Sequence, residues 1–270
     1  MLDRPSSQTV LPPLLAMEKV RKTFANRLLA LDGITLTLPG EPQVLAVLGP
    51  SGCGKSTMLR IAANLDAPSS GTIDWPAFNQ ARERGYGLNV GYVFQEPTLM
   101  PWANVHNNVL LPLKLKRAPA AAAAERVNAA LERVGLQKFA TAYPRELSGG
   151  MRMRVSIARA LVTEPALLLM DEPFAALDEI TRFKLNNDLL EVWQALRTTV
   201  VFVTHSVFES VYLSSRIVVM AARPGRVFTE LAIDAPYPRD QKFRTSADYA
   251  ALTRRTSDAL AQAMAAGGEP

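Results

Sequence analysis

The sequence has little of several residue types, and each scarcity excludes a class of protein. Cys53 is the single cysteine among 270 residues, which excludes an internal disulfide and fits a reducing compartment. The chain has two histidines, and neither has the neighbouring ligands of a metal site. No window approaches the ~18 apolar residues that a membrane span needs. Residues 1–20 lack the long apolar run of a signal peptide, so we expect the chain to stay in the cytoplasm.

Charge of one sign is also not concentrated anywhere along the chain. The net charge is +5 and no block of like charge occurs. A mild positive balance favours anionic partners such as nucleotides or a membrane surface, but the scattered basic residues do not favour nucleic acid as a partner. The hydrophobic content of 48% is that of a globular protein that can bury a sizeable core.

A phosphate-binding loop is predicted near residue 50. The apolar run Val44–Leu48 is too short for a helix and predicts a buried parallel strand. A complete phosphate-loop pattern follows, and a predicted helix starts within it; its residues are Gly49, Pro50, Ser51, Gly52, Cys53, Gly54, Lys55, Ser56 and Thr57. Glycines let successive N–H groups turn toward a phosphate, and the helix N-terminus adds partial positive charge. We expect Lys55 to bridge the β- and γ-phosphates of ATP and Ser56 to coordinate Mg²⁺.

Cys53 lies inside this loop. Its simplest role is that of a small residue without chemistry. The positive field of the loop is nevertheless expected to lower the pKa of its thiol. The rival hypothesis is that alkylation of this thiol blocks ATP hydrolysis.

Two further strand ends carry groups that suit a magnesium nucleotide. Ala166–Met170 form a second apolar run that ends in Asp171 and Glu172. Parallel strands present their carboxyl ends to one rim, so Asp171 is expected to hold Mg²⁺ through its water shell and Glu172 to polarise the attacking water. A third predicted strand, residues 198–206, is β-branched and carries His205 at its end, which favours a role at the γ-phosphate. We interpret His106 as structural.

A second candidate phosphate site lies in "ELSGGMRMRVSIARAL". Ser148 is placed to cap a helix, and Gly149 and Gly150 permit close backbone approach. In isolation, a simple glycine-containing helix start would explain the same residues.

Taken together, the motifs resemble those of the ATP-binding cassette (ABC) ATPases over nearly the whole chain. They occur in the family's order: "GPSGCGKST" as Walker A, Gln95 in "YVFQEPTLMPW" as the Q-loop, "LSGGM" as the signature, "LLLMDEP" as Walker B, "AALD" as the D-loop and His205 as the H-loop. The resemblance implies an α/β fold, namely a P-loop NTPase core with an antiparallel β subdomain and an inserted α-helical subdomain. It also implies ATP hydrolysis with Mg²⁺.

The resemblance implies a head-to-tail homodimer as well. In the family, Ser148, Gly149 and Gly150 of one copy close over the γ-phosphate held by the phosphate loop of the other, and Asp178 communicates across the dimer. Hydrolysis would remove the charge that holds the dimer closed.

The resemblance assigns two more residues to the nucleotide. Phe24 falls where an aromatic side chain stacks on adenine, with a core residue as the alternative, and Gln95 would sense both Mg²⁺ and the γ-phosphate. Gln95 is therefore expected to contribute to catalysis, nucleotide binding and metal coordination, and Lys55, Glu172 and His205 to catalysis. The chain departs from the usual pattern at Met153, often glutamine, and at Ala175, often glycine or serine.

Three segments are predicted along the chain: a tail over residues 1–14, the ATPase domain over 15–235 with its helical subdomain at about 98–158, and a partly helical extension over 236–270. Val127, Leu131 and Val134 keep helical spacing in the alanine-rich tract, and Gly135 is placed to end that helix. The extension is expected to pack on the core or on the dimer mate.

A cassette without membrane spans resembles the energising subunit of an importer. The runs "EPTLMPWANVHNNVLLPL" and "ARPGRVFTELAIDAPYPRD" are similar to the nitrate, sulfonate and taurine branch. That branch implies transmembrane permease subunits as partners, a periplasmic or extracellular solute-binding protein as an indirect partner, and a peripheral place on the cytoplasmic side of the membrane. Trp102 would lie near the permease or, alternatively, in the core of the insertion.

Other classes of protein remain as alternatives. A detached exporter cassette is the closest one. A soluble ATPase of chromosome or repair machinery would carry a long coiled coil between Lys55 and Ser148, where this chain has only a short interval. A non-hydrolysing scaffold that binds ATP only to dimerise is disfavoured because Glu172 and His205 are intact.

Overall fold

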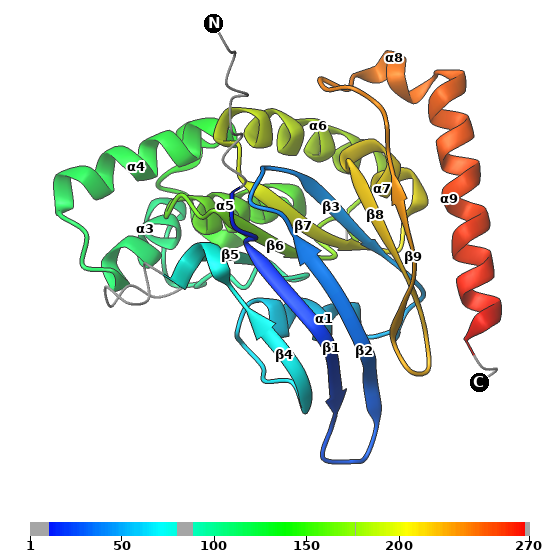
Figure 1. The fold of residues 1–270 in the computed structure, drawn as a ribbon. Coiled ribbons are helices and arrows are strands. Elements are labelled where there is room, and N and C mark those ends of the chain that lie inside the picture. The colour runs from blue at the N-terminus through cyan, green and yellow to red at the C-terminus, as the bar shows by residue number, and fades with distance from the viewer. Residues whose placement is uncertain (1–10, 80–88, 176, 268–270) are drawn as a thin grey trace, which may run out of the picture.

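The computed structural model describes residues 11–79, 89–175 and 177–267, and it contains two sheets (Figure 1). The larger sheet has the strand order β5-β6-β7-β3-β8-β9; its strands are β5 (Val90–Val93), β6 (Leu167–Asp171), β7 (Thr199–Thr204), β3 (Val44–Leu48), β8 (Arg216–Ala221) and β9 (Arg226–Ala232). All neighbours pair in parallel except β8 and β9. The chain is therefore a mixed α/β protein, as predicted.

The predicted strands match the central strands closely. The strand at Val44–Leu48 is β3 to the residue, and the strand predicted at Ala166–Met170 is β6, one residue further along. β7 ends at Thr204, because the Thr204 hydroxyl accepts a hydrogen bond from the backbone N–H of Ser206 at 3.0 Å and turns the chain there. His205 thus follows the strand instead of lying within it.

A smaller antiparallel sheet precedes and flanks the larger one. It has the order β2-β1-β4, with β1 (Leu15–Thr23), β2 (Leu29–Leu38) and β4 (Ser70–Asp74). The second half of β2 alternates exposed with buried residues, which places its leucines against the core. This is the antiparallel edge predicted near the N-terminus.

Two apolar cores flank the larger sheet, because alternate residues of each strand point to opposite faces. Leu45 and Val47 of β3 pack with α1 (Lys55–Ala62) and the antiparallel sheet, whereas Val44, Ala46 and Leu48 face the other core. That second core contains α5 (Gly149–Leu161), α6 (Glu179–Leu196) and α7 (Val207–Leu213). One turn of 3-10 helix, η1 (Pro76–Phe78), follows β4.

The helices α3 (Val105–Leu115) and α4 (Ala120–Arg133) project from one side of the sheet (Figure 1), and α5 contacts both of them. Short 3-10 turns, η2 (Gln137–Phe139) and η3 (Pro144–Glu146), lie between α4 and α5. The alanine-rich helix is confirmed as α4, and Gly135 follows its end with φ +67°. Trp102 is 77% exposed, so the interpretation of Trp102 as a core residue is wrong.

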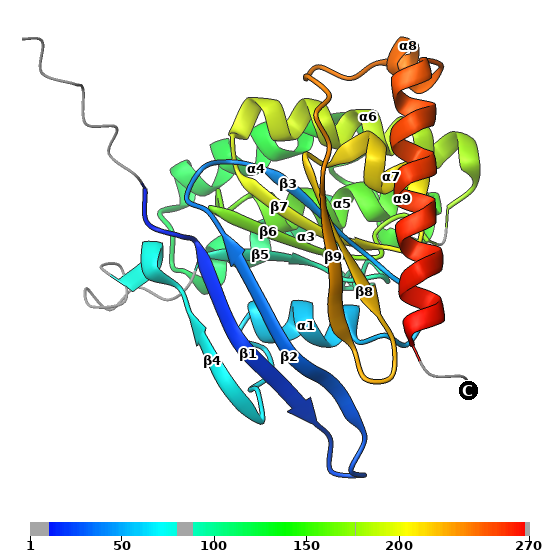
Figure 2. The ribbon, with the colours of Figure 1, turned by 45° about the vertical axis from the view of Figure 1, so that its right-hand side comes forward.

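The C-terminal extension packs along β8, β9 and α7 as α8 (Gln241–Arg244) and α9 (Ala247–Ala266) (Figure 2). Tyr249, Ala259 and Ala263 of α9 are buried, which confirms that the extension packs on the core. Across the described segments, no helix combines the length and apolar character needed to cross a membrane.

Candidate functional site

The loop Gly49–Gly54 turns the chain from the end of β3 into α1, as the phosphate-loop pattern predicts. Gly52 and Gly54 adopt the left-handed backbone, with φ +75° and +90°. A Cβ atom at Gly54 would lie 2.6 Å from Leu31 Cδ2 and 2.9 Å from the Ala30 carbonyl oxygen. Only glycine therefore satisfies both the conformation and the close approach of this loop to β2.

Lys55 places a buried ammonium group at the mouth of the loop. Its side chain is 4% exposed, and Nζ donates hydrogen bonds to the carbonyl oxygens of Gly49 and Pro50, both at 2.9 Å. Nζ also lies 3.8 Å from Glu172 Oε1. A cation held this way is suited to an anionic ligand that enters the loop.

Ser56 and Asp171 place two hard oxygen atoms side by side. The Ser56 hydroxyl donates to Asp171 Oδ1 at 2.8 Å, and the Tyr92 hydroxyl lies 3.5 Å from Asp171 Oδ2. Burial raises the pKa of Asp171, and the hydrogen bond from Ser56 opposes that rise. Hydroxyl and carboxylate oxygens fit Mg²⁺, which completes its shell with waters and substrate phosphates. Within the described parts of the chain, no group of three or more His, Cys, Asp or Glu side chains is arranged to hold a metal ion.

Glu172 and His205 meet because β6 and β7 are neighbours. Glu172 follows β6 with φ +43°, and its backbone N–H donates to the Val203 carbonyl oxygen at 3.1 Å. Its Oε2 lies 3.4 Å from His205 Nδ1. The Glu172 carboxylate thus lies between the Lys55 ammonium and the His205 imidazole. A non-glycine residue with left-handed backbone angles, such as Glu172, is often found at a functional site.

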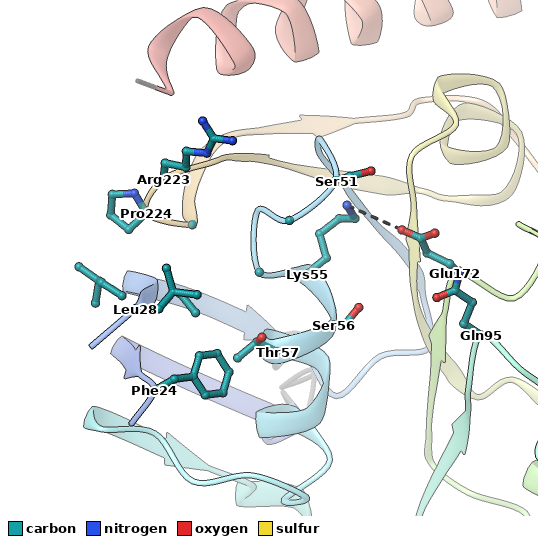
Figure 3. A pocket seen from close by; sticks show the side chains of 15 residues that line it. Phe24, Leu28, Ser51, Lys55, Ser56, Thr57, Gln95, Glu172, Arg223 and Pro224 are labelled. Atoms are coloured by element: carbon teal, nitrogen blue, oxygen red, sulfur yellow. Dashed lines mark ion pairs between the residues drawn. The ribbon is translucent and has the colours of Figure 1, made fainter. Parts of the chain in front are cut away.

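A pocket of about 800 Å³, a size typical of small-molecule sites, is bordered by Lys55, Ser56 and Glu172 (Figure 3). Asp171 and His205 do not line it, but they contact Ser56 and Glu172, respectively. Phe24 and Leu28 lie at one end, and Glu172 and Gln95 lie at the other, with the loop between them. Phe24 is 39% exposed, so its ring is available to a ligand and is not a core residue. The pocket is lined by Phe24, Leu28, Leu29, Ala30, Ser51, Gly52, Gly54, Lys55, Ser56, Thr57, Gln95, Glu172, Arg223, Pro224 and Gly225.

The hairpin between β8 and β9 supplies a wall of this pocket that no sequence motif predicts. Arg223, Pro224 and Gly225 form it. The Gly225 N–H donates to the Ala30 carbonyl oxygen at 3.1 Å, and the Gly225 backbone lies against that of Cys53. The glycine in "ARPGR" indicates only a turn, and only the fold brings that turn to the pocket.

The pKa of the Cys53 thiol differs from the expectation based on the sequence. Its side chain is 1% exposed, and burial raises the pKa of its thiol, whereas we expected a lower value. The positive charge of Lys55 does act to lower that pKa, but desolvation of the thiolate outweighs it.

The signature and D-loop residues do not line this pocket. Ser148 caps α5 by accepting a hydrogen bond from the Met151 N–H at 3.2 Å, and Asp178 caps α6 by accepting one from the Thr181 N–H at 3.0 Å. A Cβ atom at Gly150 would lie 2.7 Å from Thr181 Cγ2, so the two helix starts touch. Both therefore form a second surface, separate from the pocket.

Comparison with known proteins agrees with this geometry. The sequence profile of the ABC transporter family matches residues 31–175. An uncharacterized ABC transporter ATP-binding protein of Methanocaldococcus jannaschii is 48% identical over 87% of this chain and 86% of its own length. The aliphatic sulfonates import ATP-binding protein of Bacillus subtilis is 42% identical over 83% of this chain and 84% of its own length. A solved dimeric ATP-binding cassette in a post-hydrolysis state, bound to ADP and Pi, is similar with a TM-score of 0.69 and 31% identity, covering 82% of this chain and 100% of that one.

Proposed function

Since the chain belongs to the ABC transporter family and is an ATPase that binds ATP and Mg²⁺, we propose that it energises a membrane importer for nitrate-, sulfonate- or taurine-like solutes. The observation that carries the importer is the similarity to aliphatic sulfonates import ATP-binding proteins over most of the chain. The chemistry of the transported solute would be selected by other subunits.

The roles that we propose follow the contacts in the pocket. Lys55 and the loop N–H groups hold the phosphates, with Lys55 exchanging its carbonyl partners for phosphate oxygens. Ser56, Asp171 and Gln95 hold Mg²⁺, which would neutralise phosphate charge when bound.

Glu172 polarises the attacking water at the other end of the pocket. His205 fixes that carboxylate and faces the γ-phosphate. Phe24 stacks on the adenine ring.

We further propose that two copies assemble head to tail. Ser148, Gly149 and Gly150 would then close over the phosphates held by the second copy, and Asp178 would contact that copy. Two observations support this arrangement: the helix start at Ser148 is placed to receive an anion, and it lies outside the pocket of its own copy. The similar solved cassette is dimeric.

The permease is proposed to dock on the helical side of the molecule. Trp102 and Leu115 are 77% and 76% exposed there, and Phe94 is 39% exposed beside the Gln95 loop. Exposed large apolar side chains of this kind mark interaction surfaces. A solute-binding protein would act on the opposite side of the membrane, and this chain would sit peripherally on the cytoplasmic side.

The first test is a pull-down from the native host's membranes with tagged Glu172→Gln protein, ATP and Mg²⁺. Recovery of a multi-span permease supports the importer, and the binding protein of that permease then identifies the solute. Recovery of an export-type membrane partner would replace the importer with a detached exporter cassette. Recovery of soluble partners alone would replace it with a soluble ABC ATPase. Reconstitution with the recovered permease separates the solutes, because the cognate one, presented on its binding protein, should stimulate ATP hydrolysis.

A further inference from the structure

A buried carboxylate behind the pocket holds the chain on both sides of His205. Glu209, on α7, is 7% exposed, and its Oε2 accepts a hydrogen bond from the Thr204 hydroxyl at 2.6 Å. Its backbone N–H donates to Ser206 Oγ at 3.3 Å. The residues that precede and follow His205 are therefore both bound to Glu209.

Arg182 connects this carboxylate to a different part of the molecule. Its Nε lies 3.4 Å from Glu209 Oε1, while Nη2 donates to the Leu177 carbonyl oxygen at 3.0 Å. Leu177 directly precedes Asp178, the residue that caps α6. One guanidinium thus spans the start of α6 and the chain around His205.

The surroundings of Glu209 act on its pKa in opposite directions. Burial raises the pKa of Glu209, and the Thr204 hydrogen bond and the Arg182 charge oppose that rise. Glu209 also lies close enough to His205 and Glu172 for their charges to act on its pKa. Removing Arg182 would leave the Glu209 carboxylate, whose side chain is 8% exposed, without its opposite charge.

We propose that Arg182 and Glu209 are a positioning pair that holds His205 against Glu172 and couples this contact to the Leu177–Asp178 segment. Neither residue lines the pocket, so both act through their neighbours. The inference rests on the proposed roles of Glu172 and His205. When contact with a second copy displaces Asp178, Arg182 transmits this displacement to the imidazole of His205.

The test compares ATP hydrolysis by the full chain and by Glu209→Gln and Arg182→Gln. Glu209→Gln keeps the shape of the side chain and removes its charge, whereas Arg182→Gln removes the charge together with the hydrogen bond to the Leu177 carbonyl oxygen. We expect kcat to fall on the order of tenfold, because small misplacements of catalytic groups cost this much, while KM for ATP stays within about twofold. Arg182→Lys keeps the positive charge but lacks the several N–H donors of the guanidinium group, so it should recover part of the lost kcat. The double variant should be no worse than the single ones.

The matched control is Glu230→Gln, which removes an ion pair with Arg216 of 2.9 Å on β8 and β9. It should leave kcat unchanged. If Glu209→Gln does not fold, Thr204→Val and Thr204→Ser replace it. A lower kcat in Thr204→Val together with an unchanged kcat in Thr204→Ser supports the positioning role of Arg182 and Glu209. Wild-type kcat in the Arg182 and Glu209 variants, or a fall in kcat that follows the thermal unfolding temperature, overturns the inference. Retained turnover in Glu172→Gln and His205→Ala would instead overturn the proposed roles in the pocket.

Discussion

At the scale of single residues, Gly225 fixes the distance between the β8–β9 hairpin and the phosphate loop. A Cβ atom there would overlap the Cys53 carbonyl oxygen and lie 2.7 Å from that of Ala30, and neither backbone group can give way easily. Gly225→Ala should therefore displace the hairpin and destabilise the fold by about 1–3 kcal/mol. Titration with a fluorescent ATP analogue should show weaker binding, because the hairpin lines the pocket.

The control for this prediction is Gly33→Ala. Gly33 has φ +70°, but a Cβ atom there meets nothing within 4 Å. This variant should show backbone strain on the order of 1 kcal/mol and unchanged nucleotide affinity. If both variants lost the same affinity for the nucleotide, the result would contradict the prediction that the hairpin lines the nucleotide pocket.

The burial of the Cys53 thiol predicts how the stability of the protein changes with pH. Because its pKa is raised above the ordinary 9.0, the folded protein binds the thiol proton more tightly than the unfolded chain does. The resulting stability is present below that ordinary value and declines as the pH rises above it. Chemical denaturation between pH 7 and 10 should show this decline in the wild type and less of it in Cys53→Ala.

The same burial predicts slow alkylation of Cys53 in the folded protein and fast alkylation in denaturant. Mass spectrometry after a brief maleimide pulse checks this directly. Rapid labelling of folded protein with loss of ATP hydrolysis would restore the hypothesis of a reactive loop cysteine.

At the scale of elements, the sequence predicts those parts of the site that are local in the chain. The apolar run Val44–Leu48 and the glycines after it identify a strand and a loop, since both depend on neighbouring residues alone. Tyr92 and the hairpin at Arg223 are given no role at the nucleotide by the motifs, and they reach the site through sheet pairing. The burial of Cys53 does not follow from the sequence for a related reason: desolvation of its thiol depends on β2 and the hairpin, which pack over the loop.

The C-terminal extension offers an element-scale prediction through Arg239. This side chain is 6% exposed and donates from Nη1 to the carbonyl oxygens of Val211, Tyr212 and Ser214 at 2.9, 3.0 and 2.8 Å, at the end of α7. Arg239→Met would leave these acceptors buried without a donor, so we expect a loss of about 1–3 kcal/mol in the free energy of unfolding.

Urea denaturation measures this loss. The control is Arg255→Met, on the exposed face of α9 in the same extension, which should change stability by no more than about 0.5 kcal/mol. If Arg239→Met is as stable as the control, α7 does not depend on the extension.

At the scale of the whole molecule, the phosphate loop and the signature residues lie in separate places on one copy. The pocket holds Lys55 and Glu172, whereas Ser148 and Asp178 cap two helices whose starts touch each other outside it. Each anion-binding surface would then be incomplete within a monomer. A second copy that supplies the missing helix start explains both surfaces at once.

Gly149 allows this to be tested without disturbing the monomer, and Gly150 provides the contrast. A Cβ atom at Gly149 would lie 3.8 Å from Leu177 Cδ2, an ordinary contact, whereas at Gly150 it would lie 2.7 Å from Thr181 Cγ2. Gly149→Ala should therefore keep the thermal stability of the parent, while Gly150→Ala should lower it. In the Glu172→Gln background, sedimentation velocity should show an ATP-dependent dimer, and Gly149→Ala should remove it, because the added methyl group blocks close approach of the partner's phosphate. A Gly149→Ala protein that still dimerises with ATP would mean that the signature does not close over a second nucleotide, and the two surfaces would then need separate explanations.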